Sequence, residues 1–336
     1  MRRDERLYII FLQRRVRFSL LLSLSALLSV TLFSLLVGPT GILSLEDLLR
    51  GEPVAALRLS RTLGGLSAGV ALGLGGFALQ SVLRNPLVDP YVVGTSSGAL
   101  LGSFVAALAG APLGPLGNFI GGLLGALAAL AATYAAGRIS GFTTTGLVLS
   151  GVVVTILCSS LSAMLLLLHA DKLRWGVAWY FGSLSLVARA HQLFILASGA
   201  APLIALLAAR LRWLKLYALG EEHARVAGVE PEKLRREVLL AVAWGAAAVS
   251  STAGPIGFVG LMVPHIARLV SGGEVGATFL LTAALSPTLL LLGDIAARIV
   301  ASPAELPVGV VTSVLGSLFF LYIFLSSIKR IGVRAR

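Results

Sequence analysis

The sequence predicts an all-α polytopic membrane protein with about ten transmembrane helices. The chain is 57% hydrophobic and only 12% charged, with a mean hydropathy of +0.93, whereas soluble domains are about one-quarter charged. Apolar runs of roughly 20 residues, long enough to cross a hydrocarbon core of ~30 Å, recur along the chain. The 38 glycines are typical of closely packed membrane helices, because small residues let helix backbones approach each other.

Ten apolar segments account for most of the chain and predict one domain over residues 1–336. A cytoplasmic leader (1–17) precedes six spans (18–210), a polar segment (211–232), four spans (233–328) and a basic tail (329–336). The first apolar run is interpreted as an uncleaved span, because it is long and no small-x-small cleavage site follows it. The spans are predicted at 18–37, 60–83, 92–109, 115–137, 145–168, 191–210, 233–253, 256–271, 276–300 and 308–328.

The positions of lysine and arginine predict the orientation. Of the 27 such residues, 20 lie on the side that holds both termini and the polar segment, and 7 lie on the other side. By the positive-inside rule both termini are cytoplasmic. The net charge of +12 therefore reflects membrane topology and not nucleic-acid binding. The single cysteine, Cys158, excludes a disulfide framework and a cysteine-based metal site.

The polar segment is the only long hydrophilic insertion between predicted spans. Its stretch EEHARVA is bracketed by Gly220 and Gly228, with Glu221 and Glu222 in the first turn of a predicted short helix. The helix dipole favours acidic residues there, and Gly228 suits a left-handed C-terminal cap. Pro231 is well placed to open the next helix. The helix either contacts a soluble partner or is a solvated connector.

Two further turns lie on the cytoplasmic side. RNPLVDPYVVG breaks and restarts a helix at two prolines, and GRISGFTTTG concentrates hydroxyl groups. Such residues either close a pore or cap the following helix. On the external side, SLEDLLR (44–50) predicts a short helix, and Asp294 and Arg298 share a helix face and neutralise each other.

Several classes of chemistry are excluded or disfavoured. GLGGF in the second span is not followed by GK[ST], so the chain has no Walker A motif and is not expected to hydrolyse ATP. No metal or cofactor site is expected, because the four histidines (His169, His191, His223 and His265) form no HExxH arrangement, and His265 is interpreted as a packing residue. An ion-gradient-driven secondary transporter requires ionisable groups in mid-span, and an intramembrane enzyme requires a catalytic constellation at that depth. The predicted spans carry ionisable residues only near their ends.

Segments along most of the chain together resemble the FecCD-type permease family, the membrane subunits of type II ABC importers for iron–siderophores, haem and cobalamin. The resemblance implies two inverted five-helix halves, a homodimer of permeases in the cytoplasmic membrane, two ATP-binding subunits that use ATP and Mg, and an external substrate-binding protein. The matching segments are LRLSR (57–61), QSVLRNPLVDPYVVGTSSGA (80–99), LVLSGVVV (147–154), WYFGSL (179–184), LGEEHARVAGV (219–229), GPIGFVGLMVPHIARL (254–269) and PAELPVGVVTSVLGSLFFLYIF (303–324).

The resemblance also implies roles for individual residues. Arg58, Arg61 and Arg298 match external arginines that pair with glutamates of the binding protein, and docking charges are expected on an exposed rim. LRLSR has Ser60 where the family has proline. Asn85 and Leu87 match one layer of the cytoplasmic gate, and Thr144 and Thr145 match the other. The residues that match the helix seated in the ATPase are Leu219, Gly220, Glu221, Glu222, His223, Ala224, Arg225, Val226, Ala227 and Gly228.

The expected function is therefore that of a permease subunit without its own cofactor, with a secondary transporter as the alternative. The cargo expected from family frequency is a ferric siderophore first, then haem, then cobalamin, with an oxyanion such as molybdate as a further option.

Overall fold

A computed structural model describes residues 3–38, 41–43, 53–91, 93–110, 114–139, 144–173, 176–302 and 304–334. The side chains of residues 3–13, 42, 144–145 and 327–334 lie outside this description. The predicted external helix 44–50 also lies outside the described residues.

The described part of the chain is all-α apart from one antiparallel pair of two-residue strands. Its ten helices of 13 or more residues are α1 (Arg3–Leu36), α3 (Pro53–Val82), α4 (Thr95–Leu108), α5 (Pro115–Ile139), α6 (Thr144–Leu168), α8 (Ala190–Ala218), α10 (Pro231–Thr252), α11 (Val259–Ser271), α12 (Val275–Ile299) and α13 (Val308–Arg334). The short elements are β1 (Val37–Gly38), β2 (Gly41–Ile42), α7 (Gly176–Phe181), the 3₁₀ helix η1 (Leu184–Leu186) and α9 (Glu221–Val226). The ten long helices coincide with the ten predicted spans, and seven are long and apolar enough to cross a membrane.

Helix α3 lies at the centre of the bundle and α1 at its edge. In the most apolar window of each helix, 78% of α3 is buried but only 11% of α1. Helix α3 contacts α8, α10, α11 and α12, and the approach is close enough to require glycine. A Cβ at Gly76 would lie 1.8 Å from the carbonyl oxygen of Gly260, and one at Gly69 would lie 2.5 Å from the Cα of Pro287. The glycine-dense second span is thus a packing element.

The two halves of the chain repeat one succession of helices. In each half the second long helix ends in an irregular segment and a shorter helix follows. In the first half these are α3, residues 83–91 with 93–94, and α4; in the second half they are α10, residues 253–258 and α11. The second segment contains Gly254-Pro255 and two positive backbone angles, Gly254 (φ 83°) and Phe258 (φ 68°). We call these segments the first break and the second break.

Hydroxyl groups of the neighbouring helices satisfy the backbone of the first break. Thr155 of α6 donates to the carbonyl of Tyr91 at 2.8 Å, and Thr133 of α5 donates to that of Val93 at 3.0 Å. The carbonyl of Ala253, at the start of the second break, accepts from the backbone N–H of Ser183 at 2.6 Å. Irregular backbone is tolerated at membrane depth only where such partners or a cavity receive it.

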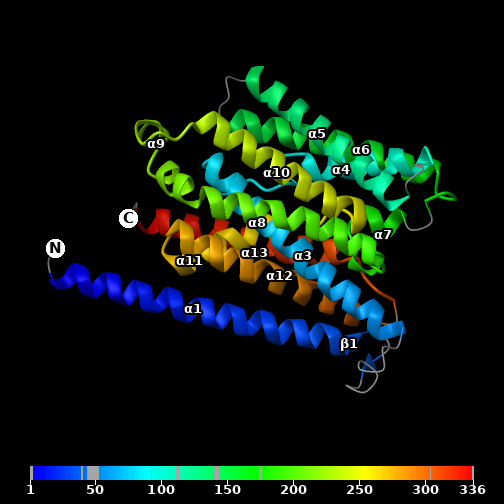
Figure 1. Cartoon of the computed structure of the whole chain (residues 1–336), viewed down its shortest axis with the longest axis horizontal. Coiled ribbons are helices and arrows are strands. Elements are labelled where there is room, and N and C mark those ends of the chain that lie inside the picture. Colours follow the sequence, from blue (N-terminus) through cyan, green and yellow to red (C-terminus); the bar gives the residue numbers. More distant parts are fainter. Residues whose placement is uncertain are drawn as a thin grey trace.

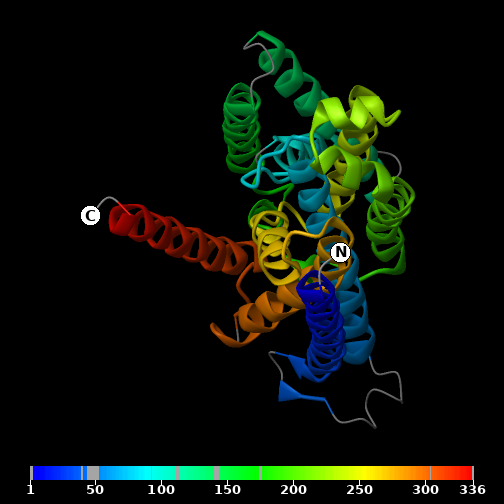
Figure 2. The ribbon, with the colours of Figure 1, turned by 90° about the vertical axis from the view of Figure 1, so that its left-hand side faces the viewer.

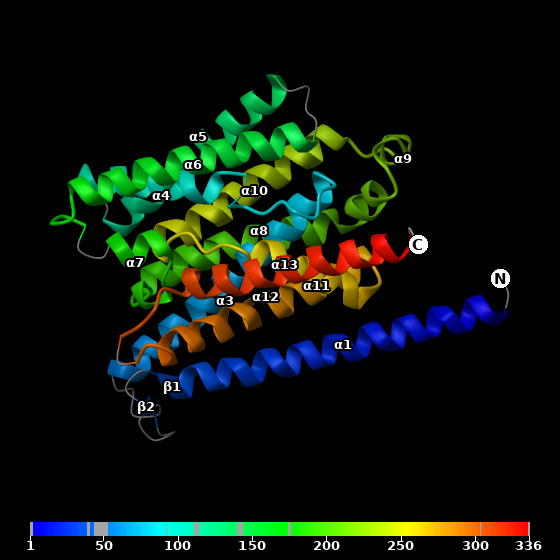
Figure 3. The ribbon, with the colours of Figure 1, turned by 180° about the vertical axis from the view of Figure 1, so that it is seen from behind.

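Both termini and α9 lie at one end of the bundle, and β1 and α7 lie at the other (Figure 1). This agrees with the predicted topology, which puts the termini and the polar segment on one side. Helix α13 stands away from the rest of the bundle (Figure 2). Seen from behind, α6 and α13 flank one face, and the two breaks run between them (Figure 3).

Several boundaries differ from those predicted. The leader does not form a separate segment, because α1 is continuous from Arg3. Helix α8 continues to Ala218, eight residues beyond the predicted end of the span at 210, because Leu214 and Tyr217 of the added turns are buried in the bundle. The eighth span begins at Val259 and not at 256, since the second break precedes it.

Candidate functional site

The three predicted docking arginines lie close together near the β1 end of the bundle, on two helices. Arg58 and Arg61 are one turn apart on α3, and Arg298 is in the last turn of α12. Their exposed fractions are only 6%, 8% and 1%. The expectation of an exposed rim is therefore wrong for this structure, because the chain supplies its own acceptors for these cations. Their role in docking stays a prediction.

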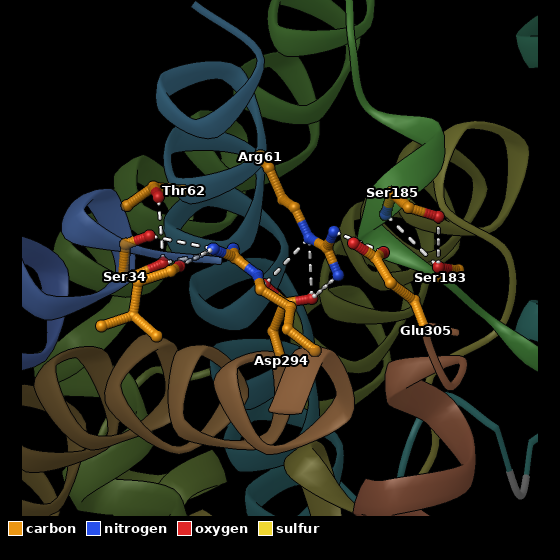
Figure 4. Close-up of polar contacts among 9 residues, drawn as sticks. Ser34, Arg61, Thr62, Ser183, Ser185, Asp294 and Glu305 are labelled. Carbon is orange, nitrogen blue, oxygen red and sulfur yellow. Dashed lines mark hydrogen bonds and ion pairs between the residues drawn. The ribbon is translucent and has the colours of Figure 1, made fainter. Parts of the chain in front are cut away.

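Asp294 is the central acceptor of this cluster. The carboxylate is fully buried and accepts from Arg61 Nε at 3.0 Å, from Arg61 Nη2 at 2.8 Å and from Arg298 Nε at 2.9 Å. The predicted neutralisation of Arg298 by Asp294 is thus confirmed, and Arg61 joins the pair from α3. Figure 4 shows Arg61 between Asp294 and Glu305, with Ser34 of α1 beside them.

Backbone carbonyls near the end of α1 complete the coordination of the other two arginines. Arg298 Nη1 donates to the carbonyls of Ser34 at 2.9 Å and Val37 at 3.0 Å. Arg58 donates to the carbonyls of Leu36 and Gly41, which belong to the end of α1 and the β hairpin. Gly38 leaves room for this, since a Cβ there would lie 2.6 Å from Arg58 Cζ. The cluster thereby ties α1, α3, α12 and the hairpin together.

Glu305 is the outermost member and was not found from the sequence. It lies in the segment between α12 and α13, and its Oε2 accepts from Arg61 Nη1 at 2.7 Å. Side-chain exposure rises from 0% at Asp294 and 1% at Arg298 to 10% at Arg61 and 26% at Glu305. The described cluster contains three cations and two anions, so it is net positive even with every carboxylate ionised.

The gate residues Asn85 and Leu87 lie in the first break. The Asn85 side-chain oxygen accepts from the backbone N–H of Leu87 at 2.9 Å, which holds the turn, and the Leu87 side chain is 55% exposed. Thr144 begins α6, but the side chains of Thr144 and Thr145 lie outside the described residues. The gate assignment stays a prediction for all four residues.

The predicted short helix of the polar segment is confirmed as α9. Gly220 precedes it, Gly228 has the predicted positive φ (82°), and Pro231 is the first residue of α10. Arg225 binds Glu221 at 2.9 Å one turn away. Leu219 and Val226 are 72% and 92% exposed, whereas Ala224 is buried against the bundle. Val226 of α9 and Leu219 just before it therefore present apolar side chains to the solvent at the end that holds both termini.

A cavity of about 260 Å³ connects α9 to the first break. Its lining includes Glu221 of α9, Tyr217 of α8 and Arg235 of α10, together with Arg84 and Val88 of the first break. Arg235 donates to the Tyr217 hydroxyl at 3.2 Å and lies 3.6 Å from the Glu221 carboxylate. The structure thus places the predicted coupling helix next to the turn that carries two predicted gate residues.

A larger cavity of about 620 Å³ lies where the two breaks meet. In secondary transporters, discontinuous helices at corresponding positions of two repeated halves form the cargo site. Its lining residues are Asp89 and Tyr91 of the first break, Pro255, Gly257 and Phe258 of the second, and Leu100, Ser159, Tyr180, Phe181, Leu261, Gly309, Val310, Ser313 and Val314. We call it the break cavity. Among the described lining residues, the Asp89 carboxylate is the one ionisable acid and no lysine or arginine is present.

Comparison with known proteins identifies the family. The sequence profile of the FecCD transport family matches residues 21–326. The chain is a member of this family. It is 36% identical over 276 residues to a probable iron chelatin transport system permease protein of Helicobacter pylori, covering 80% of this chain and 81% of that protein. It is 34% identical over 322 residues to the vitamin B12 import system permease protein BtuC of Salmonella paratyphi A, covering 94% and 97%.

Two solved structures share the fold of this chain. An inward-facing structure of a metal-chelate type ABC transporter superposes on this FecCD protein with a TM-score of 0.77 at 28% identity, covering 92% of this chain and 99% of the other. PsaBC of Streptococcus pneumoniae shares the fold, with a TM-score of 0.61 at 15% identity and coverage of 83% and 93%.

His265 lies against aromatic rings, as its interpretation as a packing residue predicts. His265 packs against the rings of Phe319 and Phe320 at 6.0 and 6.2 Å. Within the described ranges, no group of three or more His, Cys, Asp or Glu side chains is placed to hold a metal.

Proposed function

We propose that this FecCD protein is the permease subunit of a binding-protein-dependent ABC importer that carries a metal chelate. The observation that supports this best is the break cavity, because both breaks contribute to it from corresponding positions of the two halves. Its volume of about 620 Å³ is in the range of small-molecule sites. The relatives named for iron chelatin and vitamin B12 transport point to the same cargo class.

The charge of the break cavity orders the cargo candidates. The described lining offers no lysine or arginine to bind an oxyanion, and its one carboxylate is that of Asp89. We therefore place molybdate-type oxyanions last and keep a ferric siderophore first, with haem and cobalamin next. Hydroxyl groups of Tyr91, Ser159 and Tyr180 supply hydrogen bonds, and the Phe181 and Phe258 rings supply apolar surface.

A second copy of the chain is proposed to close the face between α6 and α13. Only 22% of the most apolar window of each of these helices is buried, and the irregular backbone of both breaks lies behind that face. Irregular backbone facing lipid is not tolerated in the hydrocarbon core. A homodimer joined at this face would shield it and place two break cavities on opposite sides of one axis.

ATP hydrolysis in two separate subunits is proposed to drive transport through α9. The exposed Leu219 and Val226 suit insertion into a groove of such a subunit, and the neighbouring cavity leads to the first break. The arginine cluster at the opposite end is the proposed docking place of an external binding protein. These assignments put both termini in the cytoplasm and the protein in the cytoplasmic membrane.

Reconstitution tests the proposal. The chain is placed in proteoliposomes with its ATPase subunits and binding protein, and uptake of a ferric trihydroxamate, haemin, cyanocobalamin and molybdate is measured. ATP-dependent uptake of a chelate supports the proposal. Uptake by the chain alone along a proton gradient, abolished by Asp89→Asn, would establish the secondary-transporter alternative.

A further inference from the structure

The arginine cluster contains one contact that is built differently from the rest. Asp294 is fully buried on α12, whereas Glu305 is one-quarter exposed on the segment between α12 and α13. Both carboxylates bind the same guanidinium, that of Arg61 (Figure 4). The two halves of this guanidinium therefore face different environments.

The nitrogen atoms of Arg61 are divided between the two acceptors. Nε and Nη2 donate to Asp294 at 3.0 and 2.8 Å, and Nη1 donates to Glu305 at 2.7 Å. A guanidinium is a planar fork with fixed donor directions. Asp294 consequently orients Arg61 so that Nη1 points to the position that Glu305 occupies. The carboxylate at that position can be exchanged without disturbing the buried pair of Arg61 and Asp294.

Glu305 also lies close in sequence to the start of α13, which lines the proposed transport path. It is three residues before Val308, the first residue of α13, and Gly309, Val310 and Ser313 line the break cavity. Backbone hydrogen bonds from Leu306 to Ala297 (3.0 Å) and from Gly309 to Gly182 (2.9 Å) are the neighbouring ties of this segment to the bundle.

We propose that Glu305 is an intramolecular occupant of the docking position, which a carboxylate of the binding protein displaces from Arg61. The exchange releases the segment ahead of α13 and thereby loosens the wall of the break cavity on the external side. The partner that fits is an acidic protein surface that presents a carboxylate at the Arg61 edge. This inference rests on the proposed function, and it assigns Glu305 a positioning role that acts through Arg61.

The first test needs no partner. The chain is assembled with its ATPase subunits in nanodiscs, and hydrogen exchange of residues 308–314 is measured for the wild type, Glu305→Gln and Asp171→Asn. Asp171 is an exposed acid between α6 and α7, so its variant controls for the loss of one negative charge. We expect faster exchange in 308–314 for Glu305→Gln alone, and unchanged exchange would overturn the proposal.

The second test measures docking of the importer's purified binding protein to the same nanodiscs. A partly exposed ion pair contributes little, so removal of the competing carboxylate should tighten docking about 2- to 5-fold, with Asp171→Asn unchanged. Glu305→Asp, which keeps the charge, should return the affinity toward that of the wild type. Weaker or unaltered docking of Glu305→Gln would refute the exchange, whereas a wild type that does not dock at all would instead count against the proposed function.

Discussion

Neutralising Asp294 should destabilise the protein far more than any other single loss of charge near the β1 end of the bundle. The Asp294→Asn variant leaves Arg298, which is 1% exposed, with only neutral acceptors: the carbonyls of Ser34 and Val37 and the Ser34 hydroxyl. It leaves Arg61 with Glu305 as its remaining carboxylate partner. Removing one partner of a buried ion pair typically costs about 3–5 kcal/mol, because an uncompensated charge stays in a low-dielectric site. We expect a loss in that range.

The assay is reversible unfolding of the purified chain in mixed detergent micelles, with Asp171→Asn and Glu305→Gln as comparisons. Glu305→Gln should lose no more than about 1 kcal/mol, because that pair is partly exposed. A triple variant that replaces Asp294 by Leu and both Arg61 and Arg298 by Met removes the charges together and should recover part of the lost stability. A loss below about 1 kcal/mol for Asp294→Asn, or a triple variant no more stable than the single one, would refute the reasoning.

Three further predictions follow from other parts of the structure. Gly76→Ala should destabilise the protein by about 1–3 kcal/mol or more, because its Cβ would overlap the Gly260 carbonyl. Gly293→Ala, where the nearest neighbour of the added Cβ is at 3.4 Å, should be tolerated. Equal unfolding midpoints for the two variants would contradict this prediction. Val226→Asp should uncouple ATP hydrolysis from uptake while stability changes by no more than ~0.5 kcal/mol, and normal uptake by that variant would remove α9 from the coupling path. Burial raises the pKa of Glu274, but its bonds to Lys215 and to the N–H groups of Ala277 and Gly276 outweigh this and hold the pKa below the ordinary value of 4.5. The stabilisation by Glu274 is therefore present above pH 4.5 and lost as the pH falls below that value. The difference in unfolding free energy between the wild type and Glu274→Gln should consequently shrink on acidification. A difference that stays constant with pH would argue against this role of Glu274.

The fold was largely predictable because membrane spans depend on hydropathy and length, which the sequence displays directly. Proline and glycine also marked both breaks and the ends of α9. The end of α8 was not predictable, since the burial of Leu214 and Tyr217 in its added turns depends on tertiary packing.

The candidate site was only partly predictable, for a related reason. The pairing of Asp294 with Arg298 follows from their helical spacing, but Arg61 and Asp294 are separated by 233 residues. The burial of Arg58 and Arg298 depends on carbonyl groups at the end of α1 and in the hairpin, which have no signature in the side-chain sequence. Apart from its place near Arg298, nothing in the sequence marked Glu305 as a partner of Arg61. The break cavity could not be predicted because it depends on how the two halves are placed against each other.

The glycine-rich surface of α3 has a consequence for how the molecule changes shape. Where two backbones touch, no side chain is available to adopt a second rotamer, so the contact has one geometry or none. The centre formed by α3 with α11 and α12 should therefore stay rigid during each transport cycle. The helices that move should be those whose neighbours are flexible side chains or lipid, α6 and α13 above all. The size of the conformational change should then depend on how far these two helices are displaced.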